Sequence, residues 1–382
     1  MMKFNIRRNL MGVLLNIFSF FKLEKTKQNI KKNEIKKILV ITCTGVGNML
    51  MFKPALNELK NKTPHATFTL IHMDNTAKQI FKDLHMFEKY MHIEKNIWEL
   101  IKVIINVKKE RYDISINGLI SSRNILACIP YLTRIPWRIG FVNGEDYKNK
   151  LSFTYNKKIK MKARTHEIER RLQLIEPING KKIKTEKYAL NLDKKEIQFA
   201  EKFFRECKIN KNDVKISINI GSGEGQKWKR WSIKKYAKLI SLLMNDGYKI
   251  ILNGSEEERK EIKKITRYLK NKPAISAGKT DSIKEAAAII SLSDLSVGND
   301  NGLMHVSAAV KTPTITLFGP TNWERTAPQG IDDTIIKKKI GCSPCYTLLS
   351  RGCRCSDKKN KECLEKIEVK EVYNKVKKKL CE

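Results

Sequence analysis

Hydrophobic residues follow two alternating patterns along this chain. Short runs of consecutive apolar residues, such as KILVITC at 37–43 and TITLF at 314–318, are typical of strands buried on both faces of a parallel sheet. Between such runs lie stretches in which apolar residues recur every three or four positions, as in amphipathic helices. The alternation occurs in both halves of the chain. It therefore predicts an α/β protein with two doubly wound domains and a cleft between their facing strand ends.

Individual elements can be assigned from these patterns and from capping residues. The predicted strands are 37–43, 67–72, 113–117, 138–142, 215–220, 248–252, 294–297 and 314–318. The predicted helices are 48–60, 98–108, 122–132, 166–174, 194–207, a helix to about 245 capped by Ser232, 256–270 capped by Ser255, a helix to 290 capped by Asp281, and 303–310. The predicted regions are a basic N-terminal segment (1–36), an N-terminal domain (37–178), a linker (179–190), a C-terminal domain (191–340) and a Cys-rich segment with a last helix (341–382).

The stretch from Leu295 to Pro320 is the most informative part of the chain. Its turn, GNDNG at 298–302, places backbone N–H groups and the carboxylate of Asp300 at the carboxyl end of a strand, with His305 one helical turn further on. Open α/β sheets bind ligands at this edge, and a helix N-terminus there favours an anion such as a diphosphate. A lone histidine is more often structural, so His305 can be read either way.

Glycine-rich turns follow the first predicted strand of each half. Gly45 and Gly47 lie in the first turn, and GSGEG at 221–225 forms the second. Glycine allows a ligand to approach the backbone closely. The first turn lacks the G-x-G-x-x-G spacing of a dinucleotide fingerprint, and many such turns carry glycine only for tight packing.

The chain is strongly basic, with a formal net charge of +36 over 382 residues. The lysines are spread along the whole length, which is typical of solvated helix faces, although attraction to anionic lipid or to a phosphorylated substrate is a second interpretation. We find no nucleic-acid-binding module and expect no nucleic-acid partner. The apolar stretch 10–21 is too short to span a bilayer and has basic flanks. It is read either as an interfacial membrane anchor or as a packed or mobile N-terminal helix.

Five of the nine cysteines cluster near the C-terminus, at Cys342, Cys345, Cys353, Cys355 and Cys363. The odd total and the absence of an evident cleavable signal sequence favour a cytosolic, reduced protein. The cluster is open to three interpretations: a zinc site with atypical C-x-C spacing, reduced structural thiols, or a local disulfide. We expect no cofactor.

Three segments resemble glycosyltransferase family 9, the ADP-heptose:lipopolysaccharide heptosyltransferases. They are KKILVITCTGVGNMLMFKPAL at 36–56, NIGSGEGQKWKRWSIKKYAKLI at 219–240 and VGNDNGLMHVSAAVKTPTITLFGPTNW at 297–323, and the resemblance extends over roughly 37–375. It implies a GT-B fold of two Rossmann-like domains with the active site between them, in which the N-terminal domain binds the acceptor and the C-terminal domain binds the donor. It also implies an inverting, metal-independent reaction. In the GT-B pattern the last helix would cross back toward the N-terminal domain.

The resemblance also implies roles for individual residues. Lys229 would stabilise the leaving diphosphate, although one lysine among so many is also read as solvated. Ser222 and Gly223 would line the same phosphates. Glu257 would bind the ribose of the nucleotide, or serve only as a first-turn carboxylate. Asp300, Asn301, Gly302 and His305 would hold the donor.

The main departure from the family pattern is in the N-terminal loop. The family usually has Gly-Asp where this chain has Gly47-Asn48, and that Asp is the presumed general base. An amide cannot accept a proton at neutral pH. Glu145 or Asp146 would then act as the base, or the leaving diphosphate would drive a loose transition state, or the reaction would be slow or altered.

The predicted function is transfer of heptose from ADP-heptose to a lipopolysaccharide core or related lipid-linked acceptor. The expected location is the inner face of the cytoplasmic membrane, on an anionic surface. The alternative is a non-catalytic protein that binds sugar nucleotide or glycolipid and lost its base with Asn48. The sequence does not identify the sugar, the acceptor or the oligomeric state.

Overall fold

The computed structural model describes residues 32–42, 44–94, 96–119, 125–144, 149, 151–162, 164–180, 187–223, 225–346 and 361–381. Four residues singled out from the sequence lie outside this part of the chain: Glu145, Asp146, Cys353 and Cys355. The apolar stretch 10–21 of the N-terminal segment also lies outside it. Within the described part, no helix combines the length and apolar character that a membrane span needs.

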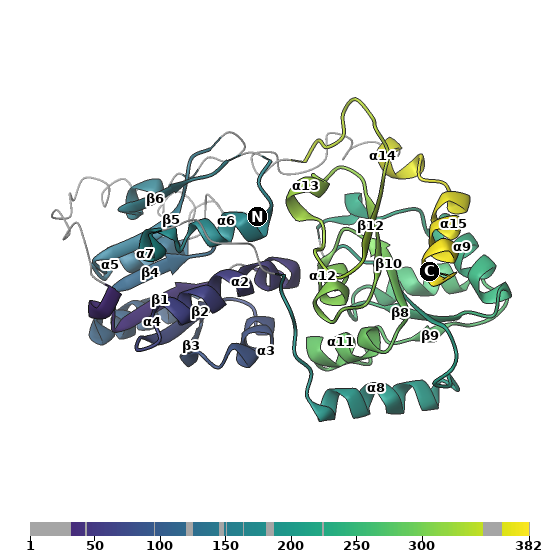
Figure 1. Ribbon diagram of the computed structural model, residues 1–382, viewed down its shortest axis with the longest axis horizontal. Helices are drawn as coiled ribbons and strands as arrows, with labels where there is room; N and C mark the ends of the chain where they lie inside the picture. Colours follow the sequence, from purple (N-terminus) through teal and green to yellow (C-terminus); the bar gives the residue numbers. More distant parts are fainter. Residues whose placement is uncertain are drawn as a thin grey trace.

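Two six-stranded parallel sheets form the centres of the two halves (Figure 1). The first has the order β3-β2-β1-β4-β5-β6 and the second the order β12-β11-β10-β7-β8-β9. Both are the Rossmann order, in which the order of the parallel strands across the sheet reverses between β1 and β4 and between β7 and β10. The predicted pair of Rossmann-like domains is thus confirmed. The strands are β1 Lys37–Ile41, β2 Thr67–His72, β3 Phe87–His92, β4 Ile114–Asn117, β5 Trp137–Val142, β6 Lys157–Lys160, β7 Lys215–Asn219, β8 Lys249–Asn253, β9 Ala274–Ile275, β10 Leu295–Asn299, β11 Thr314–Phe318 and β12 Asp333–Lys337.

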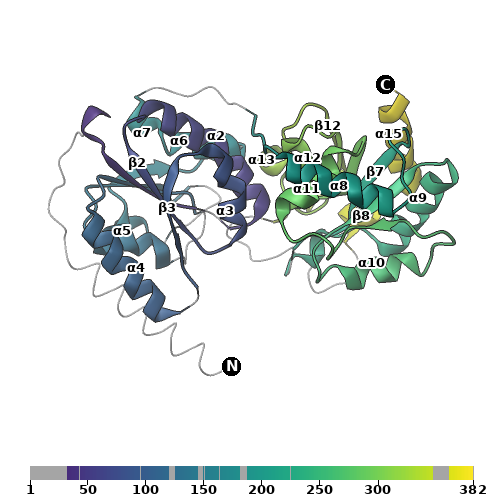
Figure 2. The same cartoon turned by 90° about the horizontal axis from the view of Figure 1, so that it is seen from below.

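Helices cover both faces of each sheet, because each parallel crossover must pass over one face (Figures 1 and 2). In the N-terminal half they are α2 Val46–Lys62, α3 Thr76–Phe81, α4 Ile97–Glu110, α5 Ile129–Leu132, α6 Glu167–Gln173 and α7 Glu176–Asn179. In the C-terminal half they are α8 Lys194–Glu206, α9 Ile233–Asn245, α10 Arg259–Thr266, α11 Ile283–Ser291, α12 Gly302–Ala309, α13 Trp323–Thr326, α14 Glu362–Glu365 and α15 Val369–Cys381.

Three predicted helix caps differ from the structure. Ser232 does precede α9, but its side chain makes no capping hydrogen bond. Ser255 does not cap α10, which begins only at Arg259, because Glu258 turns inward and holds the preceding turn. Asp281 does not cap α11 either; Ser282 does, through its hydroxyl and the backbone N–H of Glu285.

The last helix, α15, does not cross to the N-terminal domain as expected. It packs on α9, and Val372 and Val376 belong to the core of the second sheet together with Leu239 of α9. Tyr373 and Lys377 both bind Asp246, just after α9, at 2.7 and 3.1 Å. The apolar face of α15 is therefore buried within its own half.

The two halves are joined by packing between helices. α2 packs on α12 and α3 on α11, and Val306 and Ala309 belong to the same hydrophobic core as the first sheet (Figure 1). The backbone N–H of Leu190 donates to the carbonyl of Ala309 at 3.1 Å. The N-terminal end of α2 thereby lies against the N-terminal end of α12.

Candidate active site between the two sheets

Carboxyl ends of parallel strands meet at one edge of each sheet, and in this molecule the two edges approach each other. The loops after β1, β7 and β10 leave the sheets at the points where strand order reverses. Asn299, the last residue of β10, accepts hydrogen bonds from the Trp231 backbone at 2.9 Å and the Tyr236 hydroxyl at 3.1 Å. Its amide group donates to the carbonyl of Ile220 at 2.6 Å. These bonds fix the loop after β7 against the end of β10.

Lys229 and Asp300 form an ion pair at the centre of this region. The Nζ of Lys229 lies 2.9 Å from Oδ2 of Asp300, and both side chains are largely buried. Burial opposes ionisation of Asp300, but the charge and hydrogen bond of Lys229 outweigh it, so the pKa of Asp300 is lowered. The Asp300 carboxylate is therefore ionised at neutral pH.

The N-terminus of α12 is built around Asn301. Its Oδ1 accepts the backbone N–H of Met304 at 3.1 Å, and its Nδ2 donates to the carbonyls of Asn219 and Gly221 at 3.2 and 2.8 Å. One amide side chain thus caps the helix and ties it to the loop after β7. Gly302 faces the other domain, because a Cβ there would lie 3.1 Å from Cβ of Val46.

His305 is buried where the two domains meet. Its Nδ1 lies 2.9 Å from the hydroxyl of Tyr188, which also accepts the backbone N–H of Gln329 at 3.3 Å. A Cβ on Gly47 would lie only 2.5 Å from Cδ2 of His305, so glycine is required there. Burial lowers the pKa of His305 to about 4 despite the nearby Asp300 carboxylate. The imidazole is therefore neutral at pH 7.

The glycine-rich loop is held by a glutamate that the sequence did not single out. Glu258 accepts the backbone N–H groups of Ser222 and Ser255, each at 3.0 Å. The Ser222 hydroxyl donates to the carbonyl of Gln226 at 2.8 Å and accepts Nε of Arg230 at 3.0 Å. Ser222 thus shapes the loop with both of its polar groups. The predicted ribose ligand, Glu257, is exposed on the turn before α10.

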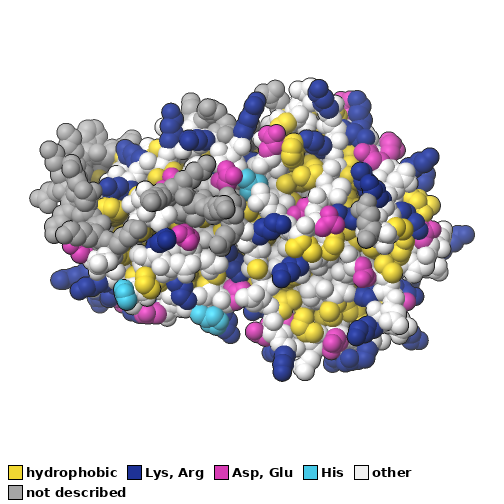
Figure 3. Space-filling view, viewed as in Figure 1, with side chains coloured by type: hydrophobic (Ala, Val, Ile, Leu, Met, Phe, Trp, Pro, Cys, Tyr) yellow, Lys and Arg dark blue, Asp and Glu magenta, His cyan; other side chains and the backbone are white. Residues whose placement is uncertain are grey.

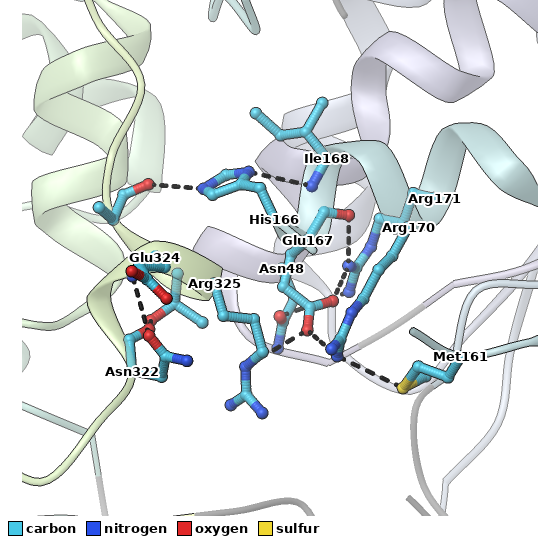
Figure 4. Close-up of polar contacts among 12 residues, drawn as sticks. Asn48, Met161, His166, Glu167, Ile168, Arg170, Arg171, Asn322, Glu324 and Arg325 are labelled. Carbon is cyan, nitrogen blue, oxygen red and sulfur yellow. Dashed lines mark hydrogen bonds and ion pairs between the residues drawn. The ribbon is translucent and has the colours of Figure 1, made fainter. Parts of the chain in front are cut away.

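Asn48, in the first turn of α2, uses both ends of its amide. Its Nδ2 donates to the carbonyl of Thr44 at 3.0 Å, and its Oδ1 accepts Nη2 of Arg171 at 3.4 Å. Figure 4 shows that Arg171 belongs to a buried cluster around the carboxylate of Glu167. Gly45, the residue before α2, has a φ of 85°, a left-handed conformation that favours glycine.

The Glu167 cluster connects the two domains. Glu167 lies 2.5 Å from Arg171 and 3.2 Å from Arg170 on its own helix, and 3.6 Å from Nε of Arg325 on α13 (Figure 4). His166 adds a second link, with Nε2 2.9 Å from the carbonyl of Ala327. Burial alone would raise the pKa of Glu167, but the three arginines outweigh it and the pKa is lowered.

The structure brings most of the predicted site residues together. Lys229, Asp300, Asn301 and Ser222 share one edge of the second sheet, and Gly223 lies exposed in the same loop, while Gly302 and His305 touch the turn at Val46 and Gly47. The sequence analysis missed Tyr188, Glu258 and the Glu167 cluster. The i, i+3 and i, i+4 spacing of Glu167, Arg170 and Arg171 was a usable signal for the helical part of that cluster.

The cysteine segment lies beside the glycine-rich loop. Cys345 and Tyr346 donate their backbone N–H groups to the carbonyl of Pro320, and the rings of Tyr346 and Trp228 are 4.9 Å apart. Cys345 and Cys363 are buried. Within the residues that the structure covers, no group of three or more His, Cys, Asp or Glu side chains is arranged to hold a metal ion.

Comparison with known proteins identifies one family. Residues 100–354 match the family described as "Glycosyltransferase family 9 (heptosyltransferase)". The chain is 26% identical to lipopolysaccharide heptosyltransferase 3 of Escherichia coli over 292 residues, which cover 72% of this chain and 80% of that protein. It is 25% identical to lipooligosaccharide heptosyltransferase 2 of Campylobacter jejuni over 346 residues, covering 89% and 97%.

The fold is similar to that of a solved enzyme. The structure of E. coli ADP-heptose lipopolysaccharide heptosyltransferase II superimposes with a TM-score of 0.72 at 21% identity, covering 90% of this chain and 98% of that one. Together with the two sheets described above, this likeness gives the chain the GT-B fold.

Proposed function

The chain belongs to glycosyltransferase family 9 and is a glycosyltransferase, and from this premise we propose that it transfers heptose from ADP-heptose to a lipopolysaccharide core or related lipid-linked acceptor. The proposal includes inversion at the sugar and no requirement for a metal ion. The names of the relatives support the sugar and the acceptor. The observation that carries the proposal is the Lys229–Asp300 pair at the N-terminus of α12.

In the proposed mechanism the donor diphosphate binds between Lys229 and the N-terminus of α12. Negative charge grows on the diphosphate as the bond to the sugar breaks, and Lys229 lies where it can stabilise that charge. Asp300 holds the ammonium group in place before the donor binds. Asn301 keeps the N-terminus of α12 against the glycine-rich loop. The neutral His305 adds no competing charge beside this site.

On the acceptor side we propose that Gly45, Gly47 and Asn48 present the acceptor hydroxyl to the donor. Asn48 orients this hydroxyl but does not remove its proton. Glu167 is a poor proton acceptor in its place, since the surrounding arginines lower its pKa. The remaining routes are a base from the loop at Glu145 or Asp146, or a loose transition state driven by departure of the diphosphate.

The first experiment tests the donor site. Purified protein would be incubated with ADP-heptose, UDP- and GDP-sugars and a truncated lipopolysaccharide, with nucleotide release and acceptor mass as readouts. We expect a mass gain with ADP-heptose that chelation with EDTA leaves intact. Lys229→Ala should lower kcat about 10²- to 10³-fold, as removal of one oxyanion donor does elsewhere. Lys227→Ala, on the exposed side of the same turn, is the matched control. Equal losses in both variants would contradict the role of Lys229.

Asn48→Asp separates catalysis from simple binding. A carboxylate at this exposed position would be ionised at neutral pH and, unlike Glu167, would not be enclosed by three arginines, so it could accept a proton from the acceptor hydroxyl. If proton removal limits the rate, kcat should rise by about 10²-fold, the lower end of the usual range of general-base catalysis. Donor binding without turnover in both wild type and Asn48→Asp would favour the alternative, a non-catalytic sugar-nucleotide-binding protein.

We also propose that the enzyme acts at the inner face of the cytoplasmic membrane, where a lipid-linked acceptor would be available. The net charge of +36 supports attraction to anionic lipid. Figure 3 shows Lys and Arg side chains scattered over the visible face of both halves, so on this face the positive charge is not gathered into one block.

A further inference from the structure

Exposed hydrophobic side chains gather on one helix. Within the described residues, seven large hydrophobic side chains are exposed, and four of them lie on α4. These four are Ile97, Trp98, Ile101 and Ile105, with exposed fractions of 50%, 69%, 39% and 48%. The other three, Val214, Tyr268 and Ile331, are far apart in the sequence. Contiguous apolar surface of this kind marks an interaction site more often than single exposed residues do.

The exposed residues of α4 widen an apolar face that is buried along its other part. Leu100, Val103 and Val107 face the core of the first sheet. Ile97, Ile101 and Ile105 follow one another at intervals of four residues, so they form a stripe beside that buried face, on the solvent side of the helix. Packing on the sheet accounts for the buried residues and leaves the stripe available to a partner outside the domain.

Positive charge surrounds this stripe. Lys102, Lys108 and Lys109 are exposed on α4. The two acidic residues of the helix are both engaged, since Glu110 binds Lys37 at 2.8 Å and also Lys89, and Glu99 accepts the backbone N–H of Glu94 at 3.1 Å. An apolar stripe flanked by lysines, with a tryptophan at one end, is the composition of helices that lie in an anionic membrane interface.

The position of α4 in the fold suits such contact. Figure 2 shows α4 on the outer side of the N-terminal half, away from α8 and α10. Since β1 and β3 are parallel strands of one sheet, their carboxyl ends lie at the same edge of it. The start of α4, which follows β3, therefore lies at the same edge as the turn at Gly45–Asn48, which follows β1. Contact through Ile97 and Trp98 would bring the proposed acceptor turn toward the bilayer.

We propose that the exposed face of α4 docks on the surface of an anionic lipid bilayer, with Trp98 and the isoleucine stripe in the interface and the lysines at the headgroups. This surface is distinct from the predicted anchor at residues 10–21. Docking would serve the proposed lipid-linked acceptor, but it depends on the exposed residues of α4 and not on which acceptor is used.

The test uses the full-length chain and vesicles of phosphatidylglycerol with phosphatidylethanolamine, compared with phosphatidylcholine. Cosedimentation gives the partition coefficient of wild type, of Trp98→Gln/Ile101→Gln/Ile105→Gln, and of the matched control Tyr268→Gln/Ile331→Gln. We expect the α4 variant to lose at least tenfold in partitioning to anionic vesicles and the control to match wild type. Brominated lipid should also quench part of the tryptophan fluorescence of wild type. The part that Trp98→Gln no longer shows is the quenching of Trp98.

Three outcomes would overturn the proposal. Unchanged partitioning of the α4 variant would assign membrane binding to another part of the chain. If the α4 variant and wild type sediment at different velocities without lipid, α4 forms a contact between two copies of the chain. Trp98 fluorescence that is already blue-shifted and unquenched by brominated lipid would mean that another segment of the chain covers it. Failure of the glycosyl-transfer assay with wild type would leave the vesicle result interpretable, so the two proposals fail separately.

Discussion

At the scale of single residues, the contact between Gly47 and His305 explains why both positions are restricted. The imidazole edge fills the space that a Cβ on Gly47 would need. The Tyr188 hydroxyl lies at Nδ1 of the His305 ring, and the His305 side chain is buried. A histidine in such a position is held neutral because its charged form would lose its hydration.

This burial predicts a pH dependence of stability. The pKa of His305 is about 4 in the folded protein and about 6.5 in an unfolded chain. As the pH falls below 6.5 the unfolded state binds a proton that the folded state does not, so stability is lost between pH 6.5 and about 4. At pH 5 the loss from this group is about 2 kcal/mol.

Chemical denaturation at pH 7 and pH 5 measures this loss. His305→Gln should be destabilised at pH 7 but should lose less stability than wild type on acidification. His65→Gln, at an exposed histidine, is the control. Equal acid losses in wild type and His305→Gln would show that His305 does not contribute the expected dependence.

At the scale of secondary-structure elements, the sequence predicted the inner strands and missed the edges. All eight inner strands were expected. The four that were not, β3, β6, β9 and β12, are the outermost strands of the two sheets. An edge strand is covered on fewer sides and can carry charge, as KKIK does in β6, so it lacks the continuous apolar run that marks a buried strand.

The candidate site divides in a similar way. Residues within one strand-turn-helix unit, such as Asp300 and Asn301, could be placed from the local pattern. By contrast, Tyr188 contacts His305, which is 117 positions away in the sequence, and Arg171 contacts Asn48, which is 123 positions away. No local pattern encodes such contacts, because they depend on how the two sheets are packed.

The cap of α12 gives a prediction at this scale. Asn301 stands where the family pattern has Thr, which can accept the capping hydrogen bond from Met304 but lacks the amide that donates to Asn219 and Gly221. Asn301→Ala should lose about 1–2 kcal/mol of stability, and Asn301→Thr should lose less. Thermal unfolding of both variants measures the difference. If Thr is as damaging as Ala, the bonds to the glycine-rich loop matter more than the cap.

At the scale of the whole molecule, one hydrophobic cluster extends across the boundary between the two Rossmann-like halves. Val306 and Ala309 of α12 lie in the cluster that also contains Leu39 and Met49 of the first half. Arg325 of α13 reaches Glu167, and the backbone N–H of Ile283 donates to Gln79 at 2.9 Å. Since these contacts join the halves at three separate places, the halves are expected to unfold together.

The buried pair of Lys53 and Asp83 provides the test of this coupling. Lys53 of α2 lies 2.7 Å from Asp83, whose carboxylate also accepts the backbone N–H of Asn191, at the start of the second half, at 3.1 Å. Lys53→Ala would leave a buried carboxylate without its cation, at a cost of about 3–5 kcal/mol. Asp83 contacts Lys53 in the first half and Asn191 in the second, so loss of Lys53 should weaken both halves together. We therefore expect calorimetry to show a single transition in wild type and also a single transition in Lys53→Ala, at a lower Tm.

A matched control lies on the same helix. Lys62 forms an exposed pair with Glu58 at 3.5 Å, and Lys62→Ala should change stability by less than about 0.5 kcal/mol. Two separate transitions in wild type would mean that the shared core does not couple the halves. Two transitions only in Lys53→Ala would mean that coupled unfolding of the halves depends on the Lys53–Asp83 pair. The packing of α2 on α12 would then contribute less to this coupling than its burial suggests.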